Sequence, residues 1–162
     1  ILRFPSNIIL RTGWLYGDKG NNFLNTILRL NNTLLETGES LKVISDQVGA
    51  PTSSYSLARL CWKILSIKNS DEKRNSSLIF HWSDSGIASW YDFAKAIIDI
   101  SFEKGLLKER VKVEPIFTNE FNRKAKRPNY SVLNTLETKK IFNIKEVYWR
   151  DELESVIERM KK

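Results

Sequence analysis

The feature that most constrains the fold is a short apolar run followed by a loop rich in glycine and asparagine. The run, residues 8–11, is bounded by turn residues and predicts a buried strand. After the loop, apolar residues recur at helical spacing over 23–35, with Asn22 as the expected N-cap and Gly38 as the expected C-cap. In α/β proteins, ligands bind where such a loop leaves a strand and enters a helix. Residues 11–23 are therefore predicted to contact a ligand.

The rest of the chain alternates extended runs with helical patterns, which predicts a mixed α/β fold. We expect further strands at 41–44, 78–82 and 111–116, and Pro115 favours a sheet edge for the last of them. Residues 45–52 are expected to form a loop whose glycine and proline fix its path. Further helices are expected from residue 53 or 54 onward, from 89 onward, from 134 or 135 to 141, and over 149–160.

Two of these helices carry a prediction about which face is buried. Ser89 and Asp92 have the spacing of a capping box at the start of the third helix. The expected buried stripes are Leu57, Ala58, Cys61, Ile64 and Leu65 on the second helix, with Trp62 beside them, and Trp90, Phe93, Ala94, Ile97 and Ile98 on the third.

Length and composition are those of one ordinary globular domain. The chain has 162 residues, of which 41% are hydrophobic and 28% charged. No apolar run approaches the ~18 residues that a membrane span needs, and the first residues do not resemble a signal peptide. Cys61 is the single cysteine, which excludes an internal disulfide and makes a reducing cytoplasm the simplest compartment.

The net charge of +7 raises the question of an anionic partner. The basic residues are scattered, with the densest group at 123–127, and we interpret most of them as solvated surface charge. No recognition motif for DNA or RNA accompanies the charge, so neither a nucleic-acid nor a membrane partner is expected. A nucleotide diphosphate, by contrast, needs only two or three cations.

Four loop segments, in this order and at these spacings, are similar to the dTDP-4-dehydrorhamnose reductase family of extended short-chain dehydrogenases/reductases. Each motif alone is weak, but four in order are fairly specific, and they extend over nearly the whole chain. The segments are residues 11–17 leading into 20–23, residues 46–52, residues 81–86 with 89–94, and residues 125–133.

The resemblance implies reduction of dTDP-4-dehydro-L-rhamnose to dTDP-L-rhamnose with NADPH, or NADH, for surface polysaccharide synthesis. It also implies that residues 1–162 are the C-terminal, substrate-binding portion of an α/β reductase. In the family the Rossmann part and a catalytic Tyr-x-x-x-Lys pair lie upstream. The chain has no G-x-G-x-x-G, and Lys19 follows Tyr16 by three residues rather than four. No catalytic residue is therefore expected here, and the portion alone is expected to be inactive.

By the same resemblance, Thr12 and Gly13 are expected to approach the nicotinamide end of the cofactor. The expected substrate contacts are Trp14, Asn22, Gln47, Arg127 and Ser131.

Each substrate contact has an alternative interpretation. Trp14 is equally well explained as a packing residue, Asn22 as a plain N-cap, and Gln47 with Asp46 as hydrogen bonds within their own loop. Arg127 is otherwise an ion-pair partner of an acid such as Asp46, and Ser131 a donor to the backbone. His81, the single histidine, is interpreted as structural.

The resemblance leaves the metal, the oligomer and the exact function open. Some members bind Mg2+ through an acid where this chain has Ser53-Ser54-Tyr55-Ser56, so no metal site is expected here. Whether the protein is a homodimer stays open. The alternatives are a non-catalytic relative, such as the regulatory subunit of methionine adenosyltransferase, a reductase or epimerase for another nucleotide sugar, and a nucleic-acid-binding module.

Overall fold

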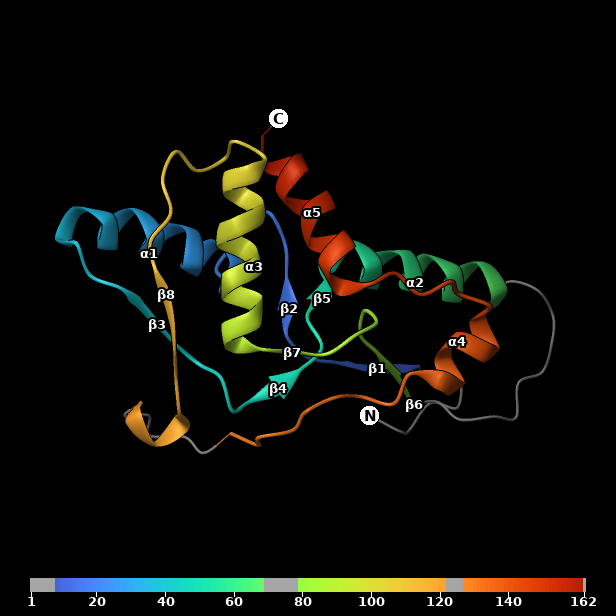
Figure 1. Cartoon of the computed structure of the whole chain (residues 1–162). Helices are drawn as coiled ribbons and strands as arrows, with labels where there is room; N and C mark the ends of the chain where they lie inside the picture. Colours follow the sequence, from blue (N-terminus) through green and yellow to red (C-terminus); the bar gives the residue numbers. More distant parts are fainter. Residues whose placement is uncertain (1–7, 69–78, 122–126, 162) are drawn as a thin grey trace.

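The computed structural model describes residues 8–68, 79–121 and 127–161, and it confirms a mixed α/β fold (Figure 1). The helices are α1 (Phe23–Thr37), α2 (Ser54–Lys68), α3 (Trp90–Glu103), α4 (Leu136–Phe142) and α5 (Trp149–Met160), with a 3-10 turn η1 (Thr118–Glu120). The longer strands are β1 (Ile9–Thr12), β3 (Leu41–Ile44), β6 (Ile79–Trp82) and β8 (Val113–Ile116). Four strands have two residues each: β2 (Leu15–Tyr16), β4 (Val48–Gly49), β5 (Thr52–Ser53) and β7 (Ala88–Ser89).

The strands pair two by two. β1 runs parallel to β6, β3 to β8 and β2 to β5, whereas β4 and β7 are antiparallel. Pro115 lies opposite Val43, and among the described strands β8 pairs with β3 alone. The prediction that Pro115 marks a sheet edge is therefore confirmed, since a residue without an N–H is tolerated there.

The local signals at the helix ends are confirmed. Asn22 Oδ1 accepts a hydrogen bond from the backbone N–H of Asn25, and Gly38 ends α1 with φ 72°. The capping box at the start of α3 is also present, with Ser89 and Asp92 exchanging hydrogen bonds. The expectation of a plain loop at 45–52 was incomplete. It contains β4 and the start of β5, and two-residue strands are too short to show a period.

The larger core surrounds α3, which stands between α1 and α5 and also contacts β3 and β8 (Figure 1). Phe93 on α3 is fully buried and meets the rings of Tyr16, Phe23 and Trp149. Its neighbours Ala94, Ile97 and Ile98 are buried as predicted, and Trp90 is half-buried. This cluster, which we call the α3 core, draws on elements from Trp14 to Met160.

A smaller cluster, which we call the α2 core, lies between α2, α4 and the β1–β6 pair. Its buried members are Leu60, Ile64, Phe80, Trp82 and Phe142. The predicted stripe of α2 was wrong in part, because Leu60 takes the place expected for Cys61 and Leu65. Ala58, Cys61, Trp62 and Leu65 are exposed, Trp62 by 71% and Leu65 by 52%.

Candidate functional site

The four loop segments singled out in the sequence meet around Val48. The N–H of Val48 donates to the carbonyl of Asn129 (2.8 Å), and its carbonyl accepts from the N–H of Ser131 (2.9 Å). Val48, in the second segment, also forms a parallel bridge with Tyr130 of the fourth segment. The N–H of Trp90 reaches the carbonyl of Gln47 (3.4 Å). Backbone hydrogen bonds thus join the second segment to the third and the fourth.

Trp14, from the first segment, completes this junction. Its indole ring stacks on that of Trp90, with centroids 3.6 Å apart and planes 6° from parallel. Its Nε1–H donates to Ser131 Oγ (3.2 Å), which in turn donates to the Val48 carbonyl (3.1 Å). A Cβ on Gly49 would lie 2.4 Å from the Trp14 ring, so only glycine allows this approach. Trp14 and Ser131 therefore have packing and backbone contacts in this structure, and their contacts with substrate stay predictions.

A cavity of about 310 Å³ opens next to the Trp14–Trp90 stack. It lies between the first turns of α1 and strand β3, and the Phe23 ring, 4.6 Å from that of Trp90, joins the cavity to the stack. Its two charged lining residues, Lys42 and Arg127, are both cationic. The lining is completed by Thr26, Ile27, Leu30, Leu41, Val43, Ile44 and Phe121.

The side chains of Asp46 and Gln47 both bond to Thr118, and these bonds fix the loop that follows β3. Asp46 Oδ1 accepts from the Thr118 N–H (2.9 Å) and hydroxyl (2.7 Å), and Gln47 Nε2 donates to Thr118 Oγ1 (3.0 Å). Gln47 is buried. Both side chains thus bond within the protein, and the described residues contain no ion pair between Asp46 and Arg127. Arg127 instead lines the cavity with its side chain exposed.

Asn22 is an N-cap, as one of its two interpretations predicted. Besides the cap at Asn25, its Nδ2 donates to the carbonyls of Gly17 (2.9 Å) and Lys19 (3.0 Å). These bonds shape the loop before α1 and use both ends of the amide. A direct contact with phosphate stays a prediction.

Thr12 and Gly13 lie at the carboxyl end of β1, where Thr12 is exposed and pairs with Trp82. A Cβ placed on Gly13 would meet no heavy atom within 4 Å. The position beside Gly13 is therefore open, and the contact of Thr12 and Gly13 with a cofactor stays a prediction.

A buried acid lies where α2 begins. Asp84 Oδ2 accepts from the N–H of Ser53 (2.8 Å), and its other oxygen accepts from the Ser56 hydroxyl. Burial raises the pKa of Asp84 to about 6, although these hydrogen bonds lower it in part. The sequence analysis missed this residue. The sequence pattern that could have identified it is an acidic residue two positions after a buried strand.

Tyr16 does not have the environment of a catalytic group, and the structural interpretation of His81 stays a prediction. The Tyr16 hydroxyl is buried without a hydrogen-bond partner among the described residues, and burial raises its pKa, with Asp84 and Glu152 adding to the shift. A phenol in such a place does not exchange protons near neutral pH. His81 sits within β6, and its backbone N–H and carbonyl both bond to Thr138 Oγ1.

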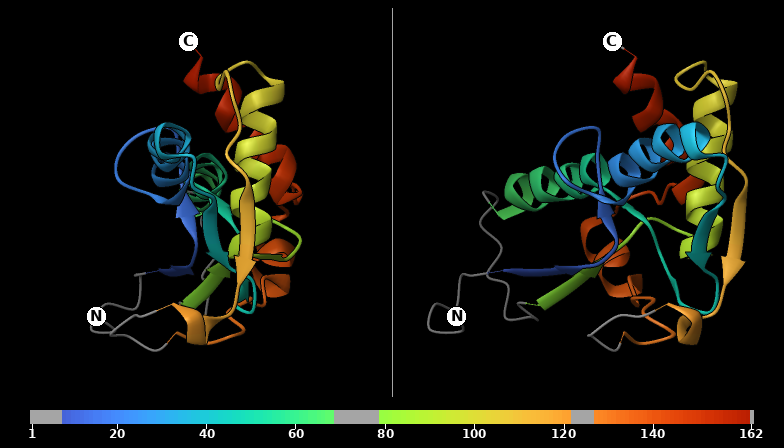
Figure 2. Two further views of the ribbon diagram at one scale, coloured as in Figure 1. Left: turned by 60° about the vertical axis from the view of Figure 1, so that its left-hand side comes forward. Right: turned by 90° about the vertical axis from the view of Figure 1, so that its left-hand side faces the viewer.

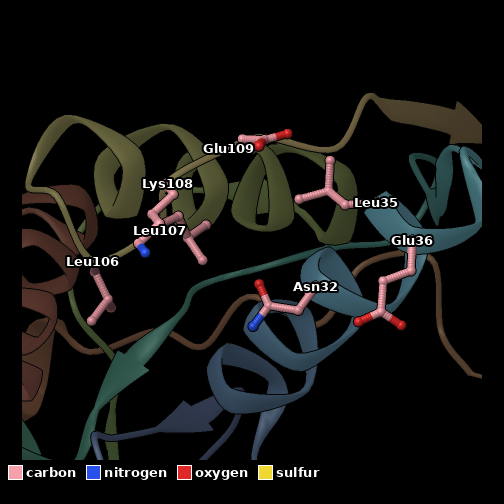
Figure 3. A pocket seen from close by; sticks show the side chains of 7 residues that line it. All are labelled: Asn32, Leu35, Glu36, Leu106, Leu107, Lys108 and Glu109. Atoms are coloured by element: carbon pink, nitrogen blue, oxygen red, sulfur yellow. The ribbon is translucent and has the colours of Figure 1, made fainter.

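A larger hollow of about 480 Å³ lies elsewhere, between α1 and the segment that follows α3 (Figure 3). Its ionisable residues are Glu36, Lys108 and Glu109, so carboxylates outnumber the ammonium group. Such a lining does not suit a diphosphate. In the described part of the chain, no three His, Cys, Asp or Glu side chains cluster as metal ligands would. None of the described helices is long and apolar enough to cross a membrane.

The class of protein follows from these observations: a mixed α/β fold, parallel strand pairs, and loops that meet beside a cavity whose charged lining residues are cationic. The fold is the C-terminal portion of an extended short-chain dehydrogenase/reductase. The chain belongs to the RmlD substrate binding domain family, whose sequence model matches residues 2–162.

Curated relatives agree with this assignment. The spore coat polysaccharide biosynthesis protein SpsK of Bacillus subtilis is 37% identical over 97% of this chain and 49% of its own length. The dTDP-4-dehydrorhamnose reductase of Aggregatibacter actinomycetemcomitans is 34% identical over 94% of this chain and 50% of its own length. The chain thus spans about half the length of the curated relatives that it matches.

Solved structures give the same picture. A dTDP-4-dehydrorhamnose reductase from Clostridium acetobutylicum is 39% identical with a TM-score of 0.79, and the match covers 98% of this chain and 50% of that one. The enzyme of this name from Bacillus anthracis, solved in complex with NADP, is 30% identical with a TM-score of 0.76, covering 94% and 48%. A UDP-glucuronic acid 4-epimerase from Bacillus cereus, at 15% identity and a TM-score of 0.64, shares the fold alone.

Proposed function

We propose that residues 1–162 are the substrate-binding portion of an NADPH-dependent dTDP-4-dehydrorhamnose reductase. The reaction is reduction of dTDP-4-dehydro-L-rhamnose to dTDP-L-rhamnose, for surface polysaccharide synthesis. The observation that carries this proposal is the cavity of about 310 Å³ with Arg127 on its lining, beside the point where the four loops meet. The names of the relatives support the same reaction.

The cavity suits a thymidine. Its volume is at the small end of the ~300–1,000 Å³ range typical of ligand sites, so it takes a nucleoside rather than a whole sugar nucleotide. The rings of Phe23, Trp90 and Phe121 offer flat apolar surface for a base. Arg127 is suited to bidentate contact with the diphosphate, and Lys42 adds a second positive charge.

The sugar is proposed to extend from the cavity toward the loop that carries Trp14. Trp14 and Ser131 border this path through their mutual hydrogen bond, and Gln47 fixes the loop beneath it. Asn22 contributes by holding the loop before α1, whose first N–H groups favour an anion.

Thr12 and Gly13 are proposed to approach the nicotinamide end of the cofactor, and the position beside Gly13 is open, since an added Cβ would meet no heavy atom within 4 Å. When bound, NADPH supplies the hydride for the sugar. The Gly-rich cofactor loop and the catalytic tyrosine and lysine are assigned to the other half of the enzyme, because the family resemblance places both upstream of this portion and the chain has no G-x-G-x-x-G. The complex of the Bacillus anthracis reductase with NADP supports the choice of cofactor.

The proposal is tested by titrating the chain with dTDP while following tryptophan fluorescence. Trp90 lines the cavity and is stacked on Trp14, so occupancy is expected to quench emission. Arg127→Ala is expected to weaken binding roughly tenfold to a hundredfold, because a hydrogen bond to a charged group contributes about 1.5–3 kcal/mol. Arg150→Ala, which removes an exposed arginine on α5, is the matched control and is expected to leave binding unchanged.

If both variants weakened binding equally, the binding of dTDP would depend only on the net charge of +7 and not on the cavity. If neither the chain nor its complex with the remaining half of a relative bound dTDP saturably, the proposed substrate class would be wrong. Tight binding of DNA or RNA with a steep salt dependence would instead favour a nucleic-acid-binding module.

A further inference from the structure

The backbone of Trp14 adopts a conformation that a bulky residue rarely takes. Its φ is 51°, in the left-handed region, and among the described residues other than glycine only Asn143 shares this region. Asn143 ends α4 as its C-cap, a position where asparagine adopts the conformation readily. An aromatic residue in this region is strained, because its Cβ crowds its own backbone. Such strain persists only where surrounding contacts enforce it, so the contacts of Trp14 must hold it in place.

Four contacts restrain Trp14. Its carbonyl accepts a hydrogen bond from the N–H of Thr52 (3.1 Å), and its indole Nε1–H donates to Ser131 Oγ (3.2 Å). Gly49 leaves room for the ring, since a Cβ there would lie 2.4 Å from Cε2 of the indole. The ring also stacks on Trp90, with centroids 3.6 Å apart. Of these contacts, the stack is the one that leads to the cavity.

Trp90 is shared between the cavity and the loop that follows β1. It lines the cavity together with Phe23, whose ring centroid lies 4.6 Å from its own. Trp14 is not among the described residues that line the cavity, and it reaches the cavity through Trp90. A ligand that packs against Trp90 restricts that ring, and it thereby favours the conformation of Trp14 that stacks on it.

We propose that Trp14 is a positioning residue that couples occupancy of the cavity to the backbone of residues 13–17. When the cavity is filled, the strained, stacked conformation is the more populated one. When the cavity is empty, the loop opens more often, because opening relieves the strain. This proposal rests on the proposed function, since its ligand is the nucleotide part of the sugar nucleotide. Its consequence is that the nucleotide orders the loop that is proposed to face the cofactor.

The test is hydrogen exchange of the amides of residues 13–17, measured with and without saturating dTDP. The ligand dTDP carries no hexose, so in the proposed arrangement it fills the cavity without touching Trp14. Exchange is expected to slow about fivefold or more on binding. Coupling is reciprocal, so a variant whose loop is already displaced is expected to bind dTDP more weakly by a similar factor.

Gly49→Ala is the variant that displaces the loop, because the added Cβ forces the indole away from Trp90. We expect faster exchange at residues 13–17 without ligand, about fivefold or more weaker binding of dTDP, and loss of the slowing on binding. If this variant does not fold, Ser131→Ala removes only the hydrogen bond to the indole and is expected to act in the same direction. Ser131→Thr keeps the hydroxyl and is expected to restore the slowing.

Gly105→Ala is the matched control. Gly105 has a φ of 72°, so this variant is also strained, and an added Cβ would meet no heavy atom within 4 Å. Gly105 follows α3, and Figure 2 shows that the segment after this helix lies at the far end from its first turn, where Trp90 begins it. The control is therefore expected to lose stability without changing exchange at residues 13–17 or the binding of dTDP.

Three results would overturn the coupling while leaving the proposed function in place, because dTDP binds in each of them. They are binding of dTDP without slower exchange at residues 13–17, unchanged affinity of Gly49→Ala, and equal weakening by Gly105→Ala. Where dTDP binds only the complex of this chain with the remaining half of a relative, the same measurements are made on that complex. If dTDP binds neither, the proposed substrate class is wrong and the coupling is wrong with it.

Discussion

The α3 core and the α2 core differ in how completely the chain itself covers them. In the α3 core, helices α1, α3 and α5 and strand pair β3–β8 close around Phe93, Leu24 and Leu153, which are fully buried. In the α2 core, one side of α2 packs on β1 and β6 while an apolar stripe on the same helix stays in water. The candidate site belongs to the first region, through Trp14, Phe23 and Trp90.

This difference separates two reasons for an apolar residue to occur in a sequence. Residues such as Phe93 are explained by contacts within the chain, since they remove aromatic area from water. Trp62 gains little from the described fold, because most of its ring remains exposed. An apolar helical stripe without internal contacts is typical of a surface that another unit covers.

The largest expected effect comes from removing the centre of the α3 core. Phe93→Ala deletes a ring that contacts Tyr16, Phe23 and Trp149, and it should lower the free energy of unfolding by about 3–5 kcal/mol. Trp62→Ala removes a larger side chain but should change stability by less than about 0.5 kcal/mol in this chain. Urea denaturation measures both. A large cost at Trp62 would contradict the exposed position of that ring.

Asp84 sharpens the comparison because it lies between the two regions. It accepts hydrogen bonds from Ser53 and Ser56 at the start of α2, and its carboxylate also senses Glu152 of α5. Its pKa is raised by burial to about 6, so the folded protein binds this proton more tightly than the unfolded chain. The contribution of Asp84 to stability is therefore greatest at low pH and is lost as the pH rises through about 4 to 6.

Asp84→Asn keeps a neutral acceptor and should thus stabilise the protein by about 2 kcal/mol at pH 7.5. The gain should shrink as the pH falls through about 6 to 4 and vanish below the unfolded-state pKa, because the acid is then protonated in both states. Urea denaturation across this pH range gives the difference directly. Asp99→Asn, which removes a partner of Lys95 and Arg110, is the control and should not stabilise the chain. A gain independent of pH would contradict the role of the buried charge.

The sequence predicted what depends on neighbouring residues. The caps of α1 at Asn22 and Gly38 and the capping box at Ser89 follow from local hydrogen bonding, and the structure contains all three. The meeting of the four loops was not predicted, since no spacing within one chain says which loops approach each other; their resemblance to a family indicated only that they belong to one kind of protein. The structure adds the atoms through which they meet, chiefly Val48 and Trp14.

Features that depend on distant segments were missed. Lys42 and Phe121 line the cavity because β3 pairs with β8, which is separated from it by about half the chain. The buried face of α2 was missed for a different reason. Helical spacing identifies apolar residues, but it does not say whether Cys61 or Leu60 faces the interior when the apolar arc covers more than half of the helix.

A smaller expected effect than those of Phe93 and Asp84 tests whether the α3 core also positions the site. Ser89→Ala removes the side-chain cap of α3, where Ser89 Oγ accepts from the N–H of Asp92 at 3.0 Å. The expected cost is about 1 kcal/mol in the free energy of unfolding. Because Trp90 is the first residue of α3, fraying of this turn should also loosen the stack of Trp90 on Trp14. Near-ultraviolet circular dichroism reports that stack. Loss of stability with an unchanged tryptophan signal would separate the stack from the helix cap, and it would leave Ser131 and Gly49 as the contacts that hold Trp14 in place.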